Sequence, residues 1–193
     1  MELRTISDYL ELLEKEMEFN QDEKKAVNMA AYLKGHFKCY GIKSPVRNEI
    51  QRKWFAELKK VHFDRWDIVY ALWDKPQREY HYIAIDYLRK MPKNGYQKDD
   101  YKKLEELIII HSWWDSVDGI ASNSVGQYFK THPDMIDKVI TRWRNSDNMW
   151  LNRTCLIFQL KYKDTLDFEL LKSLVVQFMP MKEFFIQKAI GWA

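Results

Sequence analysis

The stretch Tyr80–Ile85, Tyr-His-Tyr-Ile-Ala-Ile, returns in altered form at Leu151–Leu156 and at Phe185–Ile190. The segment Asp118–Ile120 can be aligned with these three copies. Taking the small residue of each copy as an anchor gives positions spaced by 35, 36 and 34 residues, namely Ala84, Gly119, Cys155 and Ala189. A period of this length, with one helix pair per unit, is typical of helical solenoids of the HEAT-like type. An irregular helical bundle is the alternative.

The rest of the chain carries helical patterns separated by helix breakers. Apolar residues recur three and four positions apart in Glu11–Met17 and in Trp66–Trp73. Breakers fall between such segments, at Gly41, Pro45, Pro76, Pro92, Pro133 and Pro180. No alternating strand pattern flanks the one Asn-Gly pair, at Asn94 and Gly95. We therefore predict an all-α fold, an alpha-alpha superhelix of HEAT-like repeats, with residues 1–193 forming a single domain.

Composition favours a globular protein of a reducing compartment. Of 193 residues, 46% are hydrophobic, which is enough for a sizeable core. Met1–Arg4 is polar and does not resemble the start of a signal peptide, and the aliphatic run Leu107–Ile110 is far shorter than the ~20 residues of a membrane span. Cys39 and Cys155 are expected to be reduced, buried thiols. We expect a cytoplasmic monomer with no membrane contact.

Neither charge nor histidine spacing identifies a ligand. The net charge of +3 is small, so any nucleic-acid surface has to come from a local excess of Lys and Arg. The five histidines and two cysteines show no metal-ligand spacing, so we expect neither a metal nor another cofactor.

If the repeats stack in register, distances from the anchors predict which side chains lie together. Trp114, Asp118, Arg153 and Trp192 lie at −5, −1, −2 and +3 from their anchors. At ~100° per residue these positions fall within an arc of roughly 140° on adjacent helices. The register therefore predicts one carboxylate, one guanidinium and two indoles on a common concave surface.

Ser112–Asp118, Ser-Trp-Trp-Asp-Ser-Val-Asp, resembles the signature of the AlkD-type DNA alkylation-repair glycosylases. Further blocks resemble that family in the family's order, at Tyr32–Lys34, Gly41–Arg47, Trp150–Thr154, Phe158–Tyr162 and Glu183–Trp192. The resemblance implies stacked HEAT-like repeats with a basic, concave face that holds duplex DNA at the nucleoid of a bacterial-type cell. It also implies removal of purines alkylated at N3 or N7 without extrusion of the base into a pocket.

The resemblance also assigns residues. Asp118 corresponds to the catalytic carboxylate, and Trp114 and Trp192 flank it as contacts to the lesion's sugar and backbone. Arg153 corresponds to a phosphate contact, and Tyr32 lines the same cleft. Two further DNA contacts are expected in the Gly41–Arg47 block, at Lys43 and Ser44.

The chain departs from the family pattern at two places. It stops at Ala193, where the family usually continues its final helix with basic residues, so we expect a shortened last helix. Asn152 stands beside Arg153, where the family often has a second charged residue, and we expect this to weaken phosphate binding.

The chemistry matches these residue types. An alkylated purine is already cationic and leaves readily, so the protein has to stabilise the oxocarbenium-like sugar and orient a water, and a carboxylate does both. Indole faces attract cationic groups by about 0.5–2 kcal/mol, and Arg fixes a phosphate without reading sequence.

Structural interpretations of the same residues remain open. Asp115 and Asp118 can be an N-cap and a solvated helix residue, the tryptophans can be core, and Arg153 can pair with Asp118. The alternatives to a glycosylase are a non-catalytic HEAT-like module that binds DNA and a protein–protein scaffold.

Overall fold

The computed structural model describes residues 5–92 and 94–193, so the expectation for Met1–Arg4 lies outside the described residues. Over this part of the chain the regular structure is helical, and no strand is present beyond an isolated bridge between Lys38 and Gln77. The all-α prediction is confirmed. The chain divides into two compact units, Met1–Leu88 and Arg89–Ala193, each of which is described by itself. The single domain stays a prediction.

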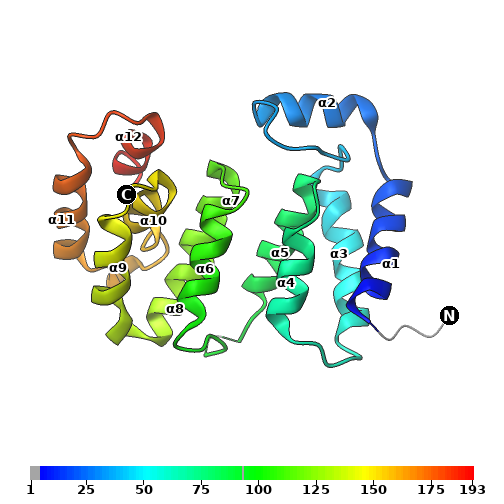
Figure 1. Cartoon of the computed structure of the whole chain (residues 1–193), viewed down its shortest axis with the longest axis horizontal. Coiled ribbons are helices and arrows are strands. Elements are labelled where there is room, and N and C mark those ends of the chain that lie inside the picture. The colour runs from blue at the N-terminus through cyan, green and yellow to red at the C-terminus, as the bar shows by residue number, and fades with distance from the viewer. Residues whose placement is uncertain (1–4, 93) are drawn as a thin grey trace. The chain divides into compact units, whose positions relative to one another are not determined.

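Unit 1 is built from α-helices joined by loops, of which the one between Tyr32 and Ser44 is the longest (Figure 1). They are α1 (Ile6–Phe19), α2 (Glu23–Tyr32), α3 (Ser44–Leu58), α4 (Arg65–Trp73) and α5 (Arg78–Arg89), whose last residue lies past the unit boundary. The two helical patterns at residues 11–17 and 66–73 fall within α1 and α4, as predicted.

The core of unit 1 follows from the spacing of apolar residues. Helix α1 buries Leu10, Leu13 and Met17, which lie on one face because they are three and four residues apart. This face packs on α3 and α4. The indole N–H of Trp54 in α3 donates to the carbonyl of Tyr9 at 2.7 Å, which satisfies the buried donor and joins the two helices.

Helix α2 buries none of its residues and runs crosswise to α1 and α3 in Figure 1. Backbone contacts attach α2 to the segment around Gly41. The N–H of Asp22, the N-cap of α2, donates to the carbonyl of Tyr40 at 2.9 Å. Gly41 has φ +84°, and a Cβ there would lie 2.2 Å from the carbonyl oxygen of Asp22 and 2.5 Å from the nitrogen of Ala26. Only glycine fits this close approach.

The loop that leads from Gly41 into α3 is held by a buried carboxylate. Glu79 of α5 is fully buried, and it accepts backbone N–H groups from Tyr40 at 3.1 Å, Gly41 at 2.9 Å and Ile42 at 3.1 Å. Three such bonds compensate the burial of the charge. They fix the path of the chain directly before Lys43.

Unit 2 is organised around α10. Its elements are α6 (Asp100–Ile109), α7 (Trp114–Gly119), the π-helix η1 (Ile120–Val125), α8 (Gly126–Thr131), the 3₁₀-helix η2 (Pro133–Met135), α9 (Ile136–Arg144), α10 (Met149–Ile157), the 3₁₀-helix η3 (Lys163–Thr165), α11 (Phe168–Phe178) and α12 (Phe184–Ile190). Helix α10 contacts α6, α7, η1, α9, α11 and α12. Every residue from Leu151 to Ile157 is buried.

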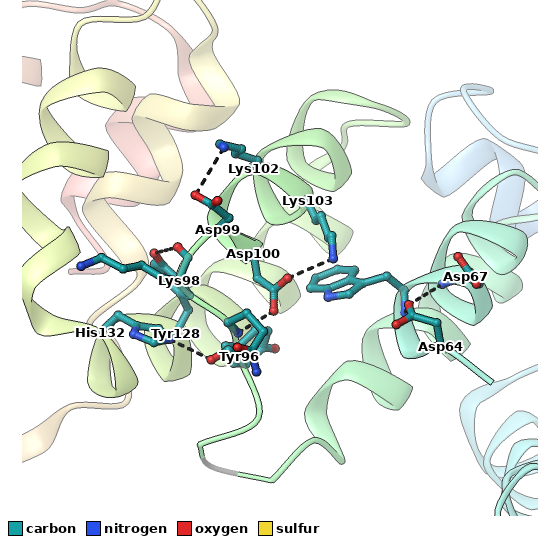
Figure 2. Close-up of polar contacts among 12 residues, drawn as sticks. Asp64, Asp67, Tyr96, Lys98, Asp99, Asp100, Lys102, Lys103, Tyr128 and His132 are labelled. Carbon is teal, nitrogen blue, oxygen red and sulfur yellow. Dashed lines mark hydrogen bonds and ion pairs between the residues drawn. The ribbon is translucent and has the colours of Figure 1, made fainter. Parts of the chain in front are cut away.

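Polar contacts close the loop before α6 onto α8 (Figure 2). The Tyr128 hydroxyl donates to the carbonyl of Lys98 at 2.8 Å. His132 Nε2 lies 2.8 Å from the carbonyl oxygen of Tyr96, so this ring nitrogen carries the proton. Both bonds provide a partner for a carbonyl group of the loop, which lies outside the helices and so has no helical hydrogen bond.

The anchors of the sequence repeat lie on α5, α7, α10 and α12, and three of them, Ala84, Cys155 and Ala189, are fully buried. The expectation of buried thiols holds for Cys155, whose pKa burial raises far above its usual range, while Cys39 is half-buried. Neither cysteine is part of a disulfide. In residues 5–92 and 94–193, no helix has both the length and the apolar character that crossing a membrane requires.

Candidate active site

Asp118 sits where an α-helix changes into a π-helix. The backbone is extended at Trp113 (φ −160°, ψ 158°), α7 begins at Trp114, and it passes directly into η1 at Ile120. The Asp118 carbonyl accepts the Ser122 hydroxyl at 2.8 Å, four residues ahead. Short π-helical segments inside α-helices often occur at functional sites.

Asp118 and Arg153 form a two-pronged ion pair. Arg153 Nε lies 2.7 Å from Oδ1 of Asp118, and Nη2 lies 2.8 Å from Oδ2. The Arg153 side chain is 5% exposed and the Asp118 side chain 15%, so the pair is largely shielded from water. This matched geometry of guanidinium and carboxylate fixes the orientation of both planes.

The pKa of Asp118 is raised above its ordinary value of 3.8. Burial is the largest cause, because it disfavours the charged carboxylate. The hydrogen bonds and the positive charge of Arg153 act in the opposite direction, and the negative charge of Asp115 adds to the effect of burial. Arg153 is therefore the group that favours the ionised form of Asp118.

Arg153 is in turn oriented by the backbone and by helix α10. Its Nη1 donates to the carbonyl of Phe185 at 2.5 Å. Helix α10 begins at Met149 because Asn148 is its N-cap, with Oδ1 accepting the N–H groups of Trp150 at 2.9 Å and Leu151 at 3.3 Å. Arg153 follows in the second turn.

Three aromatic rings pack behind the ion pair, and we call them the aromatic brace. Ring centroids are 5.9 Å apart for Trp113 and Trp150, 5.3 Å for Trp113 and Phe185, and 5.1 Å for Trp150 and Phe185. The Arg153 guanidinium lies 6.0 Å from the centroid of Phe185. The brace fixes the segment whose carbonyl accepts from Arg153. The sequence analysis missed it, and its only signal was the Trp-Trp doublet.

The structure brings together some of the predicted site residues of unit 2. Asp118 and Arg153 are in contact, and Trp114, half-buried, lies four residues before Asp118 on the same face of α7. Trp192 is 55% exposed in the turn after α12, where it lines a cavity of about 270 Å³ with Leu156 and Leu171. Its expected contact to the lesion stays a prediction.

The structure also places two residues close to the ion pair in the sequence, Asn152 and Asp115. Asn152 is 2% exposed, and its amide donates to the carbonyls of Trp143 at 2.8 Å and Ser146 at 3.1 Å. Its side chain supports the connection from α9 to α10, and the expected weakening of phosphate binding stays a prediction. Asp115 is not an N-cap, because Trp113 holds that position of α7.

The predicted DNA contacts of unit 1 lie at two helix ends. Tyr32 is the last residue of α2 and is 67% exposed. Lys43 is the N-cap residue of α3, and Ser44 is the exposed first residue of that helix. Tyr32 and Lys43 line one cavity.

Within the described residues, no group of three or more His, Cys, Asp or Glu side chains is arranged to hold a metal ion.

A side chain of the π-helix η1 contacts a cationic residue that the sequence analysis did not single out. Asn123 Oδ1 accepts a hydrogen bond from the Lys161 ammonium. Burial lowers the pKa of Lys161, and the positive charge of Arg89 lowers it further.

Comparisons with known proteins agree with the resemblance. The family described as "DNA alkylation repair enzyme" matches residues 13–193. A solved structure described as a predicted DNA alkylation repair enzyme from Enterococcus faecalis superimposes with a TM-score of 0.80 and is 28% identical. The match covers 89% of this chain and 80% of that one. The curated proteins contain no match. Since the family match spans nearly the whole chain, the protein belongs to the DNA alkylation repair enzyme family.

Proposed function

We propose that the protein is a DNA glycosylase that releases N3- and N7-alkylated purines from duplex DNA without base flipping. The observation that carries this proposal is the Asp118 carboxylate, held by two bonds from a buried Arg153 in a member of the alkylation repair family. Membership of this family implies DNA as the substrate.

In the proposed reaction the bond between C1′ of the sugar and the purine nitrogen breaks, and its electron pair goes to the cationic base, which leaves neutral. Asp118 stabilises the oxocarbenium-like sugar by its negative charge. A water then adds to C1′, and its proton passes to Asp118 and on to solvent. Each carboxylate oxygen keeps a lone pair free of the Arg153 bonds, because a carboxylate oxygen accepts more than one hydrogen bond.

Arg153 acts in this proposal through Asp118. A buried carboxyl group that is protonated at neutral pH stabilises no cation, and Arg153 lowers the pKa of Asp118 against the effect of burial. The phosphate contact expected of Arg153 stays a prediction. Trp114 is positioned on the same face of α7 to favour a cationic adduct over a neutral base.

The test uses purified protein and methylated duplex DNA, with the released bases identified by chromatography and mass spectrometry. We expect the wild type to release N3-methyladenine and N7-methylguanine. Asp118→Asn should bind the duplex but release neither, because its amide carries no charge. Asp115→Asn, three residues earlier on the same helix, is the matched control and should stay active. Undiminished release by Asp118→Asn would refute the mechanism.

One observation favours a second candidate, a non-catalytic module that binds DNA. Both Asp118 oxygens accept bonds from Arg153, as they would in a purely structural ion pair. This candidate predicts firm duplex binding without base release, even when protein is present in stoichiometric amounts. Binding should weaken steeply with added salt in either case, since both depend on phosphate contacts.

A further inference from the structure

A cavity in unit 1, which we call the α2 pocket, has a volume of about 310 Å³. One wall is a single face of α2, because Lys25, Asn28 and Tyr32 are three and four residues apart. Lys43 from the start of α3 and Tyr82 from α5 complete the polar and aromatic lining. A pocket near the lower end of the usual range for small-ligand sites has room for one nucleotide and not for a duplex.

The interior of the α2 pocket is apolar, and one of its aromatic rings is held in place. Met29 and Leu33 contribute apolar surface, and Leu33 is 2% exposed. The Tyr82 ring is held by the guanidinium of Arg47, which lies 4.7 Å from the ring centroid. Arg47 is itself fixed, with Nη2 3.9 Å from a carboxylate oxygen of Asp86. An aromatic ring held in this way is suited to stack on a flat ligand.

The rim of the α2 pocket is cationic. No Asp or Glu is among its lining residues. Lys25 is paired with Asp22, whereas Lys43 forms no ion pair with any residue of the described part of the chain. Lys43 also stands at the N-terminus of α3, a helix of 15 residues with no acidic residue in its first turn and no side-chain cap. The partial positive charge of that helix end adds to the ammonium group.

We propose that the α2 pocket binds one unpaired nucleotide of a DNA strand. The base stacks against Tyr32 and Tyr82, Asn28 reaches its polar edge, and Lys43 with Lys25 contacts the phosphate. An aromatic surface beside cationic groups is the usual way in which proteins bind an unpaired base without regard to sequence. The proposal rests on DNA as the substrate, it concerns a nucleotide other than the alkylated one, which is released without base flipping, and it involves no step at Asp118.

The test measures binding of the full chain to a duplex with one unpaired 2-aminopurine nucleotide and to the same duplex fully paired. We expect tighter binding of the bulged duplex and quenching of 2-aminopurine by stacking. Tyr32→Ala and Lys43→Gln should weaken binding of the bulged duplex at least about fivefold, the smallest loss expected for one stack. The matched controls are Phe168→Ala, at a ring that is 62% exposed in α11, and Lys53→Gln, at an exposed lysine of α3.

Equal affinity for bulged and paired duplexes in the wild type would overturn the proposal. The proposal would also be overturned if the two control variants lost the preference for the bulged duplex as much as Tyr32→Ala and Lys43→Gln do. The third ligand is free 2-aminopurine nucleoside monophosphate. If the protein bound it as tightly as the bulged duplex, the bound nucleotide would not need to be part of a DNA strand, and the proposal would be overturned. Asp118→Asn should keep the preference. A chain that prefers the bulge but releases no alkylated purine refutes the glycosylase and leaves this inference standing.

Discussion

Replacing Arg153 by Met removes the cation of the ion pair and keeps most of the volume of the side chain. The N–O distances of 2.7 and 2.8 Å and the low exposure, 5% and 15%, place the pair among buried salt bridges. Removing one partner of such a pair costs about 3–5 kcal/mol, because the other charge stays buried without compensation. That is a large part of a total stability on the order of 5–15 kcal/mol.

The expected change in melting temperature follows from the length of the chain. For proteins of about 150–250 residues, 1 kcal/mol corresponds to about 2–4 °C, so Arg153→Met should melt about 6–20 °C below the wild type at neutral pH. The assay is thermal unfolding followed by circular dichroism. The matched control is Arg142→Met, because Arg142 makes the same two-pronged contact to Glu105 at 3.0 and 2.8 Å but is 65% exposed. Exposed pairs contribute about 0–1 kcal/mol.

The pH dependence of the loss has a definite sign. Without Arg153 the pKa of Asp118 rises further, because the group that opposes the effect of burial is gone. A carboxyl group with a raised pKa in the folded state destabilises the protein above that pKa and ceases to do so once it is protonated. The gap between Arg153→Met and the wild type should therefore narrow as the pH falls from neutrality. A variant that melts no lower than Arg142→Met, with a gap independent of pH, would refute the reasoning.

Three further measurements test other parts of the structure. The rate of base release should fall as the pH decreases through the pKa of Asp118, which burial raises above 3.8, so single-turnover release should have its acid limb above that value. Gly126→Ala places a Cβ 2.7 Å from the carbonyl oxygen of Phe158 and should cost about 1–3 kcal/mol in urea unfolding; an unchanged midpoint would show that α8 can move away from α10. Glu79→Gln should cost about 1–3 kcal/mol, and faster amide exchange at Tyr40 should accompany it, because the one acceptor oxygen of the amide keeps the bonds from Gly41 and Ile42 and the bond from Tyr40 is lost.

The contact between Asp118 and Arg153 could be predicted because it depends on register alone. Residues at similar offsets in successive repeats lie on adjacent helices, and this pair, at offsets that differ by one residue, is separated by 35 residues. The all-helical fold could be predicted for a similar reason, since the period of the apolar residues fixes the type of element.

The aromatic brace could not be predicted, because its geometry depends on local backbone. Trp113 and Trp114 are neighbours, and which of them faces Trp150 is decided by the extended conformation at Trp113. Phe185 accepts a hydrogen bond from Arg153 through its backbone carbonyl. Because every residue has such a carbonyl, the identity of residue 185 gives no sign of this bond. The location of the Asn152 side chain could not be predicted either, because neighbours on a helix point about 100° apart and adjacency to Arg153 says little about where it lies.

The absence of buried residues on α2 has a consequence for the dynamics of the fold. When this helix lifts away from unit 1, it withdraws none of its own side chains from the core, and the backbone bond from Asp22 to Tyr40 breaks. Segments with so little buried contact open on their own, at free energies far below that of global unfolding. One wall of the α2 pocket thus belongs to a separate cooperative unit, so the pocket can widen and close again while α1, α3 and α4 stay folded.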